Sequence, residues 1–275
     1  MRVAATRRLW WGEHPASSYD RIDPDATVAV LPISAVEQHG PHLPLCTDQA
    51  IMEGMLETVA AIVPSDVDLR ILPVQAVGKS DEHLFAAGTL SLPATTLIDN
   101  WTRLGALVAK TGVRKLVIVN SHGGNEDVMG IVARNLRVAH GMLVGKTSWF
   151  GFGYPAALFS ELEIRDGIHG GDIETSLMLH FRPDLVDMAL AENFRSAHAV
   201  ALEHFKHLRP VGRIAFAWEA DDLHPSGAVG NAAAATAEKG RETARYQAEA
   251  FVDFLRDMRA ADLSQLLAPS AQRSE

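Results

Sequence analysis

Residues 27–34, TVAVLPIS, and the loop that follows them, residues 35–48 with the sequence AVEQHGPHLPLCTD, decide the fold. Residues 27–34 are apolar and β-branched with little alternation, which is typical of a central parallel strand covered on both faces. The loop carries Glu37, His39, His42 and Asp48 and is stiffened by two prolines. Carboxylates interleaved with imidazoles favour a site for a first-row metal. The alternative interpretation of this stretch is a polar surface loop. Other segments of the chain have to decide between a metal site and such a loop.

Composition and charge exclude several classes of protein. The 275 residues are 47% hydrophobic and 21% charged, which is the balance of an ordinary globular protein with enough apolar material for a core. The formal net charge of -9 argues against a general nucleic-acid binder, which would carry a basic patch. Neither a membrane-spanning run nor a secretory signal is recognisable, and a single cysteine, Cys46, rules out an intrachain disulfide. We therefore expect a cytoplasmic protein without nucleic-acid or membrane partners.

The rest of the chain alternates between strand and helix patterns. Further strands are expected at 69–77, 115–120, 142–150 and 212–219. Helices are expected at 48–63, 95–110, 126–139 and 231–258, and from the segment 169–176 to about residue 181. Strands alternating with helices of about ten to sixteen residues predict an α/β fold with a mostly parallel sheet. We interpret residues 1–275 as a single domain, with 1–25 as a peripheral lead-in and 259–275 as a polar tail.

Acidic and imidazole side chains come after three of the predicted strands, two of them at the start of the helix that follows the fourth strand. They are Glu37, His39, Asp48, His122, His169 and Glu174. The carboxyl ends of parallel strands meet at one edge of a sheet, so residues far apart in sequence can converge there. Such ligands suit Zn(II), Mn(II) or Fe(II) rather than copper or an iron–sulfur cluster. Three carboxylates also exceed what one tetrahedral zinc usually takes, so we expect two divalent metal ions per chain, bridged by a carboxylate and a water.

Five segments of the chain match the sequence motifs of one known family. They are residues 31–48 (LPxGSxEQHGPHLPLxTD), 80–92 (SxEHxxFPGTLSL), 120–125 (NGHGGN), 169–176 (HAGxxETS) and 227–240 (GxxGxxxxATxEKG). The departures are Ser34-Ala35 for Gly-Ser, Ala86-Ala87 for Phe-Pro, Ser121 for the first Gly of the third motif, and Gly170 for Ala. The chain thus resembles the creatininase family of metal-dependent amidohydrolases.

The resemblance implies a three-layer α/β/α fold that carries two divalent metals. By position, Asp48 would bridge the two ions. Glu37 and His122 would hold one ion and His39 the other. His42 is expected to brace the loop rather than to bind a metal.

The chain departs from creatininase proper at one ligand. Creatininase has a glutamate two residues after the histidine that matches His122, where this chain has Gly124. We expect Glu174 to supply the missing ligand, as in the family members with the HGGN turn, and Asp172 is the competing candidate. Creatininase activity itself is therefore less expected than another amidohydrolase reaction.

The predicted chemistry is the attack of a metal-bound hydroxide on a carbonyl carbon, with the metals stabilising the oxyanion. His169 is the candidate acid for the leaving nitrogen, because a neutral imidazole gains a proton readily near pH 7. Glu174 is the second candidate catalytic residue. The candidate substrate-binding residues are Ser80, His83, Gly124, Asn125 and Trp149. Alternatives are a capping role for Ser80 and His83, a mere tight turn at residues 123–125, and core packing for Trp149.

The function predicted is an amidohydrolase that acts on a C–N bond, other than a peptide bond, of a small cyclic or linear amide. Within the family, the alternatives are a peptidase or a formamide hydrolase that acts on a cofactor precursor. Alternatives from other classes are a non-catalytic protein that binds a small ligand and a metal-dependent lyase or isomerase. The resemblance also implies a homo-oligomer, a hexamer, in which His224 could reach a neighbouring subunit's site.

Overall fold

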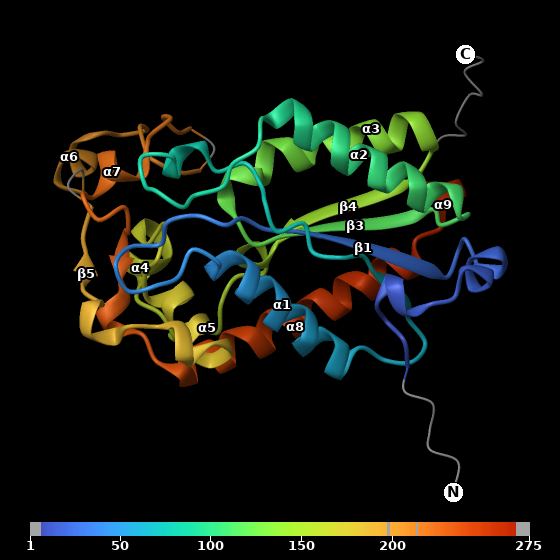
Figure 1. Ribbon diagram of the computed structural model, residues 1–275, viewed down its shortest axis with the longest axis horizontal. Coiled ribbons are helices and arrows are strands. Elements are labelled where there is room, and N and C mark those ends of the chain that lie inside the picture. The colour runs from blue at the N-terminus through green and yellow to red at the C-terminus, as the bar shows by residue number, and fades with distance from the viewer. Residues whose placement is uncertain (1–6, 197–198, 213, 268–275) are drawn as a thin grey trace, which may run out of the picture.

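The computed structural model describes residues 7–196, 199–212 and 214–267, and a parallel sheet lies at its centre (Figure 1). The sheet has four strands in the order β2-β1-β3-β4. Their bounds are Thr27–Ile33 for β1, Asp68–Ile71 for β2, Lys115–Asn120 for β3 and Leu143–Ser148 for β4. Every pairing in this sheet is parallel, so the carboxyl ends of the strands share one edge.

Helices cover both faces of the sheet (Figure 1). On one face lie α2 (Ala94–Lys110) and α3 (Glu126–His140), and on the other lie α1 (Thr47–Ile62), α5 (Asp172–Phe181) and α8 (Ala237–Ala260). Two hydrophobic cores result, one on each side of the sheet. This arrangement confirms the predicted three-layer α/β/α fold with a parallel central sheet.

The residues of β1 explain why its sequence shows no alternation. Val28 and Val30 enter the core under α1 and α8, whereas Ala29, Leu31 and Ile33 enter the core under α2 and α3. All five side chains are fully buried. A strand with two apolar faces has a continuous apolar sequence. Burial of each large side chain stabilises the folded state by roughly 1.5–3 kcal/mol.

Short elements gather near the carboxyl ends of the strands (Figure 1). They are α4 (Glu161–Asp166), α6 (Ala199–His204), α7 (Ala220–Leu223) and the antiparallel pair β5 (Asn193–Phe194) and β6 (Gly230–Asn231). The short helix α9 spans Leu263–Leu266. The 3-10 turns are η1 (Trp11–Glu13), η2 (Ala16–Arg21), η3 (Asp81–His83), η4 (Gly123–Asn125), η5 (Trp149–Phe152), η6 (Pro183–Leu185), η7 (Met188–Leu190) and η8 (Ala232–Ala234). Among the described residues, none of the helices is both long and apolar enough to cross a membrane.

The strand predicted at 69–77 is wrong in its second half. Strand β2 ends at Ile71, and Pro73 follows two residues later. Proline has no N–H to donate to a ladder, so regular pairing stops there. Gln75 regains a single parallel bridge to Ile33 and donates its N–H to the Pro32 carbonyl at 2.9 Å.

Two predictions in the C-terminal third also need correction. No strand occurs in the described part of 212–219, where Ala215 makes one isolated bridge to Arg209. The long helix predicted from residue 231 starts at Ala237, because Thr236 caps it by accepting the Lys239 N–H at 3.2 Å. Residues 230–234 form β6 and η8 instead. The predicted polar tail lies partly outside the described residues.

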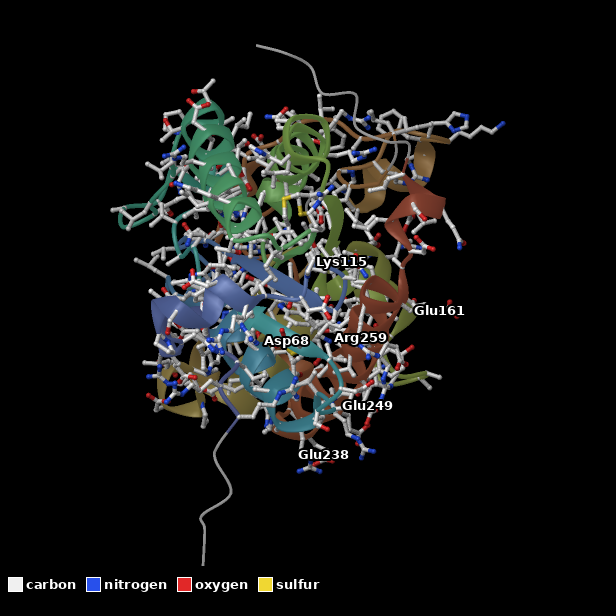
Figure 2. All side chains as sticks on the ribbon, turned by 90° about the vertical axis from the view of Figure 1, so that its right-hand side faces the viewer. Asp68, Lys115, Glu161, Glu238, Glu249 and Arg259 are labelled. Carbon is white, nitrogen blue, oxygen red and sulfur yellow. The ribbon has the colours of Figure 1, made fainter. Side chains whose placement is uncertain are left out.

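A buried lysine joins three segments at the end of the sheet opposite the predicted site (Figure 2). Lys115 begins β3 and is 1% exposed. Its Nζ donates to the Asp25 carbonyl and to the Arg259 carbonyl, both at 2.6 Å. Arg259 lies in the last turn of α8, whose carbonyls lack partners within the helix. The lead-in, the sheet and the end of α8 are thereby tied together.

Candidate metal centre

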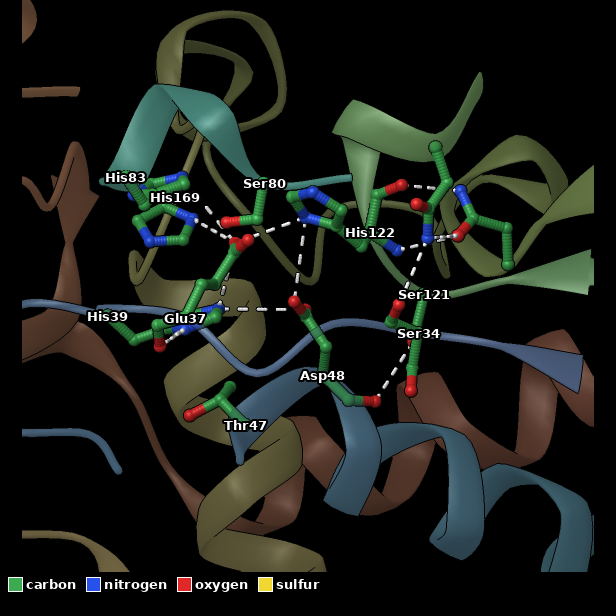
Figure 3. A network of polar contacts seen from close by, with 12 residues as sticks. Ser34, Glu37, His39, Thr47, Asp48, Ser80, His83, Ser121, His122 and His169 are labelled. Carbon is green, nitrogen blue, oxygen red and sulfur yellow. Dashed lines mark hydrogen bonds and ion pairs between the residues drawn. The ribbon is translucent and has the colours of Figure 1, made fainter. Parts of the chain in front are cut away.

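Asp48 lies in the first turn of α1 with its two carboxylate oxygens facing two different histidines (Figure 3). Its Oδ1 is 3.5 Å from His39 Nε2, and its Oδ2 is 3.5 Å from His122 Nδ1. The side chain is 1% exposed. One carboxylate thus lies between ligand atoms that come from the β1–α1 loop and from the end of β3.

Glu37 lies at the middle of four imidazoles. Its Oε1 is 3.1 Å from His122 Nδ1, 3.5 Å from His83 Nε2, 3.7 Å from His169 Nδ1 and 4.0 Å from His39 Nε2. Burial alone would raise the Glu37 pKa, but the charges of His122, His83 and His169 outweigh burial and lower that pKa. Glu37 is therefore an anion at the centre of the cluster.

Each of these four histidines places its second ring nitrogen against a carbonyl oxygen. The pairs are His39 Nδ1 with Glu37 O at 3.0 Å, His122 Nε2 with Lys79 O at 2.8 Å, His169 Nε2 with Gln38 O at 2.6 Å and His83 Nδ1 with Gln38 Oε1 at 3.3 Å. A carbonyl oxygen only accepts, so these nitrogens carry the protons. In the neutral rings, the nitrogens facing Glu37 then carry lone pairs, which is the arrangement of metal-binding histidines.

The polar atoms of the centre fit a divalent cation. Glu37 Oε2, Asp48 Oδ2 and His39 Nε2 are buried without a hydrogen-bond partner among the described residues. Buried polar atoms are normally paired, and buried charges are normally neutralised by a counter-charge or a metal. Three groups of side chains have ligand atoms within 4.8 Å of one another. They are Glu37–His39–His169, Glu37–Glu82–His122 and His39–Asp48–Glu174.

The centre also attracts protons. Burial lowers the His39 pKa, but the Asp48 carboxylate, Glu174 and Glu37 outweigh burial and raise that pKa to about 9. In the same way, Glu37 outweighs the effect of burial on His122 and raises the pKa well above its usual value. The carboxylates thus require nearby positive charge, which a metal would supply by displacing these protons.

Glu174 and Asp172 lie in the first turn of α5 but have different partners. Glu174 Oε2 is 3.8 Å from His39 Nε2 and accepts the Gly170 N–H at 2.6 Å. Asp172 pairs with Lys239 Nζ at 2.6 Å instead. Of the two acids, Glu174 lies beside the centre and Asp172 belongs to the contact between α5 and α8.

The predicted catalytic residue His169 stacks between two other imidazoles. Its ring centroid is 4.0 Å from that of His39 and 4.1 Å from that of His83. Burial and the charges of His39 and His83 lower the His169 pKa well below its ordinary value. Because Gln38 O holds the Nε2 proton, Nδ1 of the neutral ring is the nitrogen free to accept a proton.

Comparison with known proteins gives matches over most of the chain. The sequence model of the creatininase family, described as creatinine amidohydrolase, matches residues 15–255. The chain belongs to the creatininase family. A mycofactocin precursor peptide peptidase of Mycobacterium ulcerans (strain Agy99) is 31% identical over 236 residues, which is 84% of this chain and 85% of the relative. A creatinine amidohydrolase of Pseudomonas putida is 29% identical over 197 residues, 66% of this chain and 72% of the relative.

Solved structures of creatininases have the same fold as this creatininase-family hydrolase. A tryptophan-to-phenylalanine mutant of creatininase superposes with a TM-score of 0.74 at 26% identity, over 92% of this chain and 100% of that chain. A glutamate-to-glutamine mutant of the Zn–Zn type has a TM-score of 0.73 at 25% identity, over 93% of this chain and 100% of that chain.

The candidate metal centre of this creatininase-family hydrolase opens into a cavity of about 990 Å³. Of the predicted substrate-binding residues, His83, Gly124 and Trp149 line it. Trp149 is 3% exposed, and its Nε1 has no hydrogen-bond partner among the described residues. Ser80 and Asn125 are buried, and neither is among the described residues that line the cavity.

Asn125 connects three segments of the creatininase-family fold beneath the site. Its Oδ1 accepts the Lys79 N–H at 2.9 Å, and its Nδ2 donates to Ser34 O and to Asn120 Oδ1, both at 3.1 Å. His42 acts similarly on the other side, with Nε2 2.9 Å from Thr175 Oγ1. The predicted bracing role of His42 agrees with this contact.

Sequence reasoning missed three residues of the site. Gln38 positions His83 and His169 through its side-chain and main-chain oxygens, and its place between two predicted ligands was the available signal. Glu82 Oε1 lies 3.3 Å from His122 Nε2 and lines the cavity. Tyr154 also lines the cavity, and nothing in its sequence context indicated this.

Proposed function

We propose that this protein is a dinuclear-metal-dependent amidohydrolase that cleaves a C–N bond. The observation that carries the proposal is the position of Asp48. Each of its two carboxylate oxygens lies 3.5 Å from a ring nitrogen of a different histidine, His39 Nε2 or His122 Nδ1. A carboxylate in this position suits a bridge between two ions. Buried carboxylates and imidazoles without thiolates suit zinc, manganese or iron.

The proposed ligands divide into two groups that share Asp48. Glu37 and His122 would hold one ion, since Glu37 Oε1 and His122 Nδ1 are 3.1 Å apart. His39 and Glu174 would hold the other, and their facing atoms are 3.8 Å apart. When bound, the two ions would activate a water and polarise the carbonyl of the substrate.

His169 is the proposed proton carrier. Its Nε2 proton is fixed on Gln38 O, so proton exchange takes place at Nδ1. The neutral ring can accept a proton from the attacking water at Nδ1 and then donate it to the leaving nitrogen. Glu174 is the second candidate group for proton transfer, and burial and the Asp48 charge raise its pKa to about 7 in the metal-free protein.

Two classes of amide are candidate substrates. Small cyclic or linear amides fit the family as a whole, in which creatinine amidohydrolase is a relative. A peptide is favoured by the cavity of about 990 Å³ and by the relative named mycofactocin precursor peptide peptidase at 31% identity. Ligand pockets range from roughly 300 to 1,000 Å³, so this cavity has room for several residues of a peptide.

Elemental analysis of the purified protein, paired with a hydrolysis panel, tests the proposal. The panel contains creatinine, other lactams, small linear amides and short peptides. We expect two metals per chain and hydrolysis of at least one amide class, abolished by chelation and restored by Zn or Mn. Less than one metal per chain without rescue by either ion would refute a dinuclear hydrolase. Absence of tightly bound metal together with absence of turnover would favour the non-catalytic alternative.

We also propose a homo-oligomer in the cytoplasm. Leu84, Phe85 and Leu90 support an assembly, because these apolar side chains are 55%, 41% and 51% exposed beside the site. Contiguous exposed apolar side chains commonly mark protein–protein contacts. Light scattering of the purified protein tests the proposed hexamer, and a monomer would contradict it.

A further inference from the structure

Glu163 is a buried carboxylate next to the metal centre that none of the proposed catalytic steps uses. It lies on α4, is 5% exposed and lines the cavity. Carboxylates are rarely buried to this extent unless they are paired. Its partners are main-chain amides rather than cationic side chains.

Each oxygen of Glu163 accepts one main-chain hydrogen bond. Oε1 accepts the Asp172 N–H at 2.7 Å, and Oε2 accepts the Asn231 N–H at 2.9 Å. Asp172 lies in the first turn of α5, where N–H groups have no acceptor within the helix. A negative charge at this end also interacts favourably with the helix dipole. One side chain therefore caps α5 and joins it to β6.

Three glycines make room for this carboxylate. A Cβ atom at Gly167, Gly171 or Gly230 would lie within 3.0 Å of a Glu163 oxygen. The main chain thus closes around the carboxylate from three sides. The enclosed space suits the Glu163 carboxylate, and it has no room for side chains at the three surrounding positions.

The main chain held by Glu163 is the segment that carries His169 and Glu174. His169 forms a two-way main-chain pair with Val229, the residue before Gly230, with N···O distances of 3.1 and 2.6 Å. Glu174 lies two residues after Asp172, in the same first turn of α5. Movement of the main chain around Glu163 would therefore displace both side chains.

We propose that Glu163 is a positioning residue for His169 and for the metal site formed by His39, Glu174 and Asp48. The proposal rests on the proposed dinuclear function. It predicts an effect on one metal site only. Glu37 and His122 are carried by the ends of β1 and β3, and no hydrogen bond joins either of them to Glu163 among the described residues.

The test compares Glu163→Gln and Glu163→Asp with the wild type and with Glu161→Gln. Glu161 lies on the same helix and is exposed at the surface (Figure 2), so it controls for charge on α4. Zinc titration against a competing chelator gives the affinities of the two sites. We expect the affinity of one site to fall roughly 10–100-fold in both Glu163 variants, as for other residues that orient ligands. The affinity of the other site should change less than about twofold.

Hydrogen–deuterium exchange of the metal-free protein provides a second readout. Both Glu163 variants should exchange faster over residues 168–174 and at the wild-type rate over α1. Equal loss at both metal sites would indicate a general structural role and overturn the proposal. Unchanged affinity and unchanged exchange would also overturn it. If the wild type binds no metal, the dinuclear function fails, while the exchange data still decide whether Glu163 holds this segment.

Discussion

Asp48 is the proposed bridging ligand, and its surroundings disfavour the ionised form of its carboxyl group. Burial and the neighbouring Glu37 charge raise its pKa, so an ionised Asp48 is destabilised in the metal-free protein. A bound cation removes this cost, because it offsets the repulsion between the two carboxylates. Metal binding and folding stability are therefore linked through this residue.

Replacement of Asp48 by alanine should remove both metals, since the proposed bridge contributes to both sites. Elemental analysis after gel filtration gives the metal content, and loss of only one metal would refute the bridging role.

The Asp48→Asn variant keeps the shape of the side chain but removes its negative charge. In the absence of metal this variant should unfold at a higher temperature than the wild type, and a lower melting temperature would contradict the argument.

Metal uptake at pH 7 should release protons. The His39 pKa is raised to about 9 and that of His122 lies well above its usual value, so both rings are protonated at pH 7 without metal. Metal ligation requires their neutral forms. The apparent affinity should therefore fall as the pH falls below about 9. Calorimetry in two buffers of different ionisation enthalpy measures the release, and His39→Gln should release fewer protons.

At the scale of elements, the contact between α5 and α8 sets the position of Glu174. Lys239 Nζ bonds Asp172 Oδ2 at 2.6 Å across this contact, and Thr236 N–H donates to Ser176 Oγ at 3.1 Å. The residues that match the last sequence motif thus pack α8 against the start of α5. They lie outside the metal centre and support one of its proposed ligands.

Gly240→Ala should destabilise the protein. A Cβ at this position would lie within 3.0 Å of the Ser176 carbonyl oxygen, which belongs to the main chain of α5 and cannot turn aside. Overpacking of this kind costs roughly 1–3 kcal/mol. Urea unfolding of the metal-free protein measures the change. Glu242→Ala, on the exposed face of the same helix, is the control, and equal stabilities of the two variants would contradict the packing argument.

The sequence allowed prediction of the elements that depend on periodicity. Strand β1 and helix α1 agree with their predicted ranges within one or two residues, because both are regular and buried. Strand β2 is shorter than the predicted range 69–77, since Pro73 has no N–H to donate to the ladder. The role of Glu163 depends on Gly230 lying close to Gly167 and Gly171 although it is far from them in sequence, so no local pattern indicated it.

The site could be predicted where acidic and histidine residues come after predicted strands in the sequence. Glu37, His39, Asp48 and His122 converge because parallel strands end at one edge. The choice between Glu174 and Asp172 required the position of Lys239, which no pattern in the sequence gives. That residues 1–275 form a single domain stays a prediction.

At the scale of the whole molecule, the metal centre and the Lys115 junction lie at opposite ends of the sheet. Lys115→Met should destabilise the fold without changing the metal content, since the Asp25 and Arg259 carbonyls lose their shared donor. Each of these part-buried hydrogen bonds, donated by a charged group, contributes roughly 1.5–3 kcal/mol. Urea unfolding and elemental analysis measure the two effects. A change in metal content in the folded variant would show that the two ends are coupled.

The carbonyl oxygens that hold the four imidazoles have a consequence for the choice of metal. Because the rings are already oriented, loading requires little rearrangement, and the mixed imidazole and carboxylate ligands suit several first-row ions. Intrinsic affinity then follows the general order in which zinc binds more tightly than iron(II) or manganese(II). The ion found in the protein should accordingly reflect the supply in the cell. Cultures grown in manganese-rich, zinc-depleted medium should yield a manganese-loaded protein of the same structure.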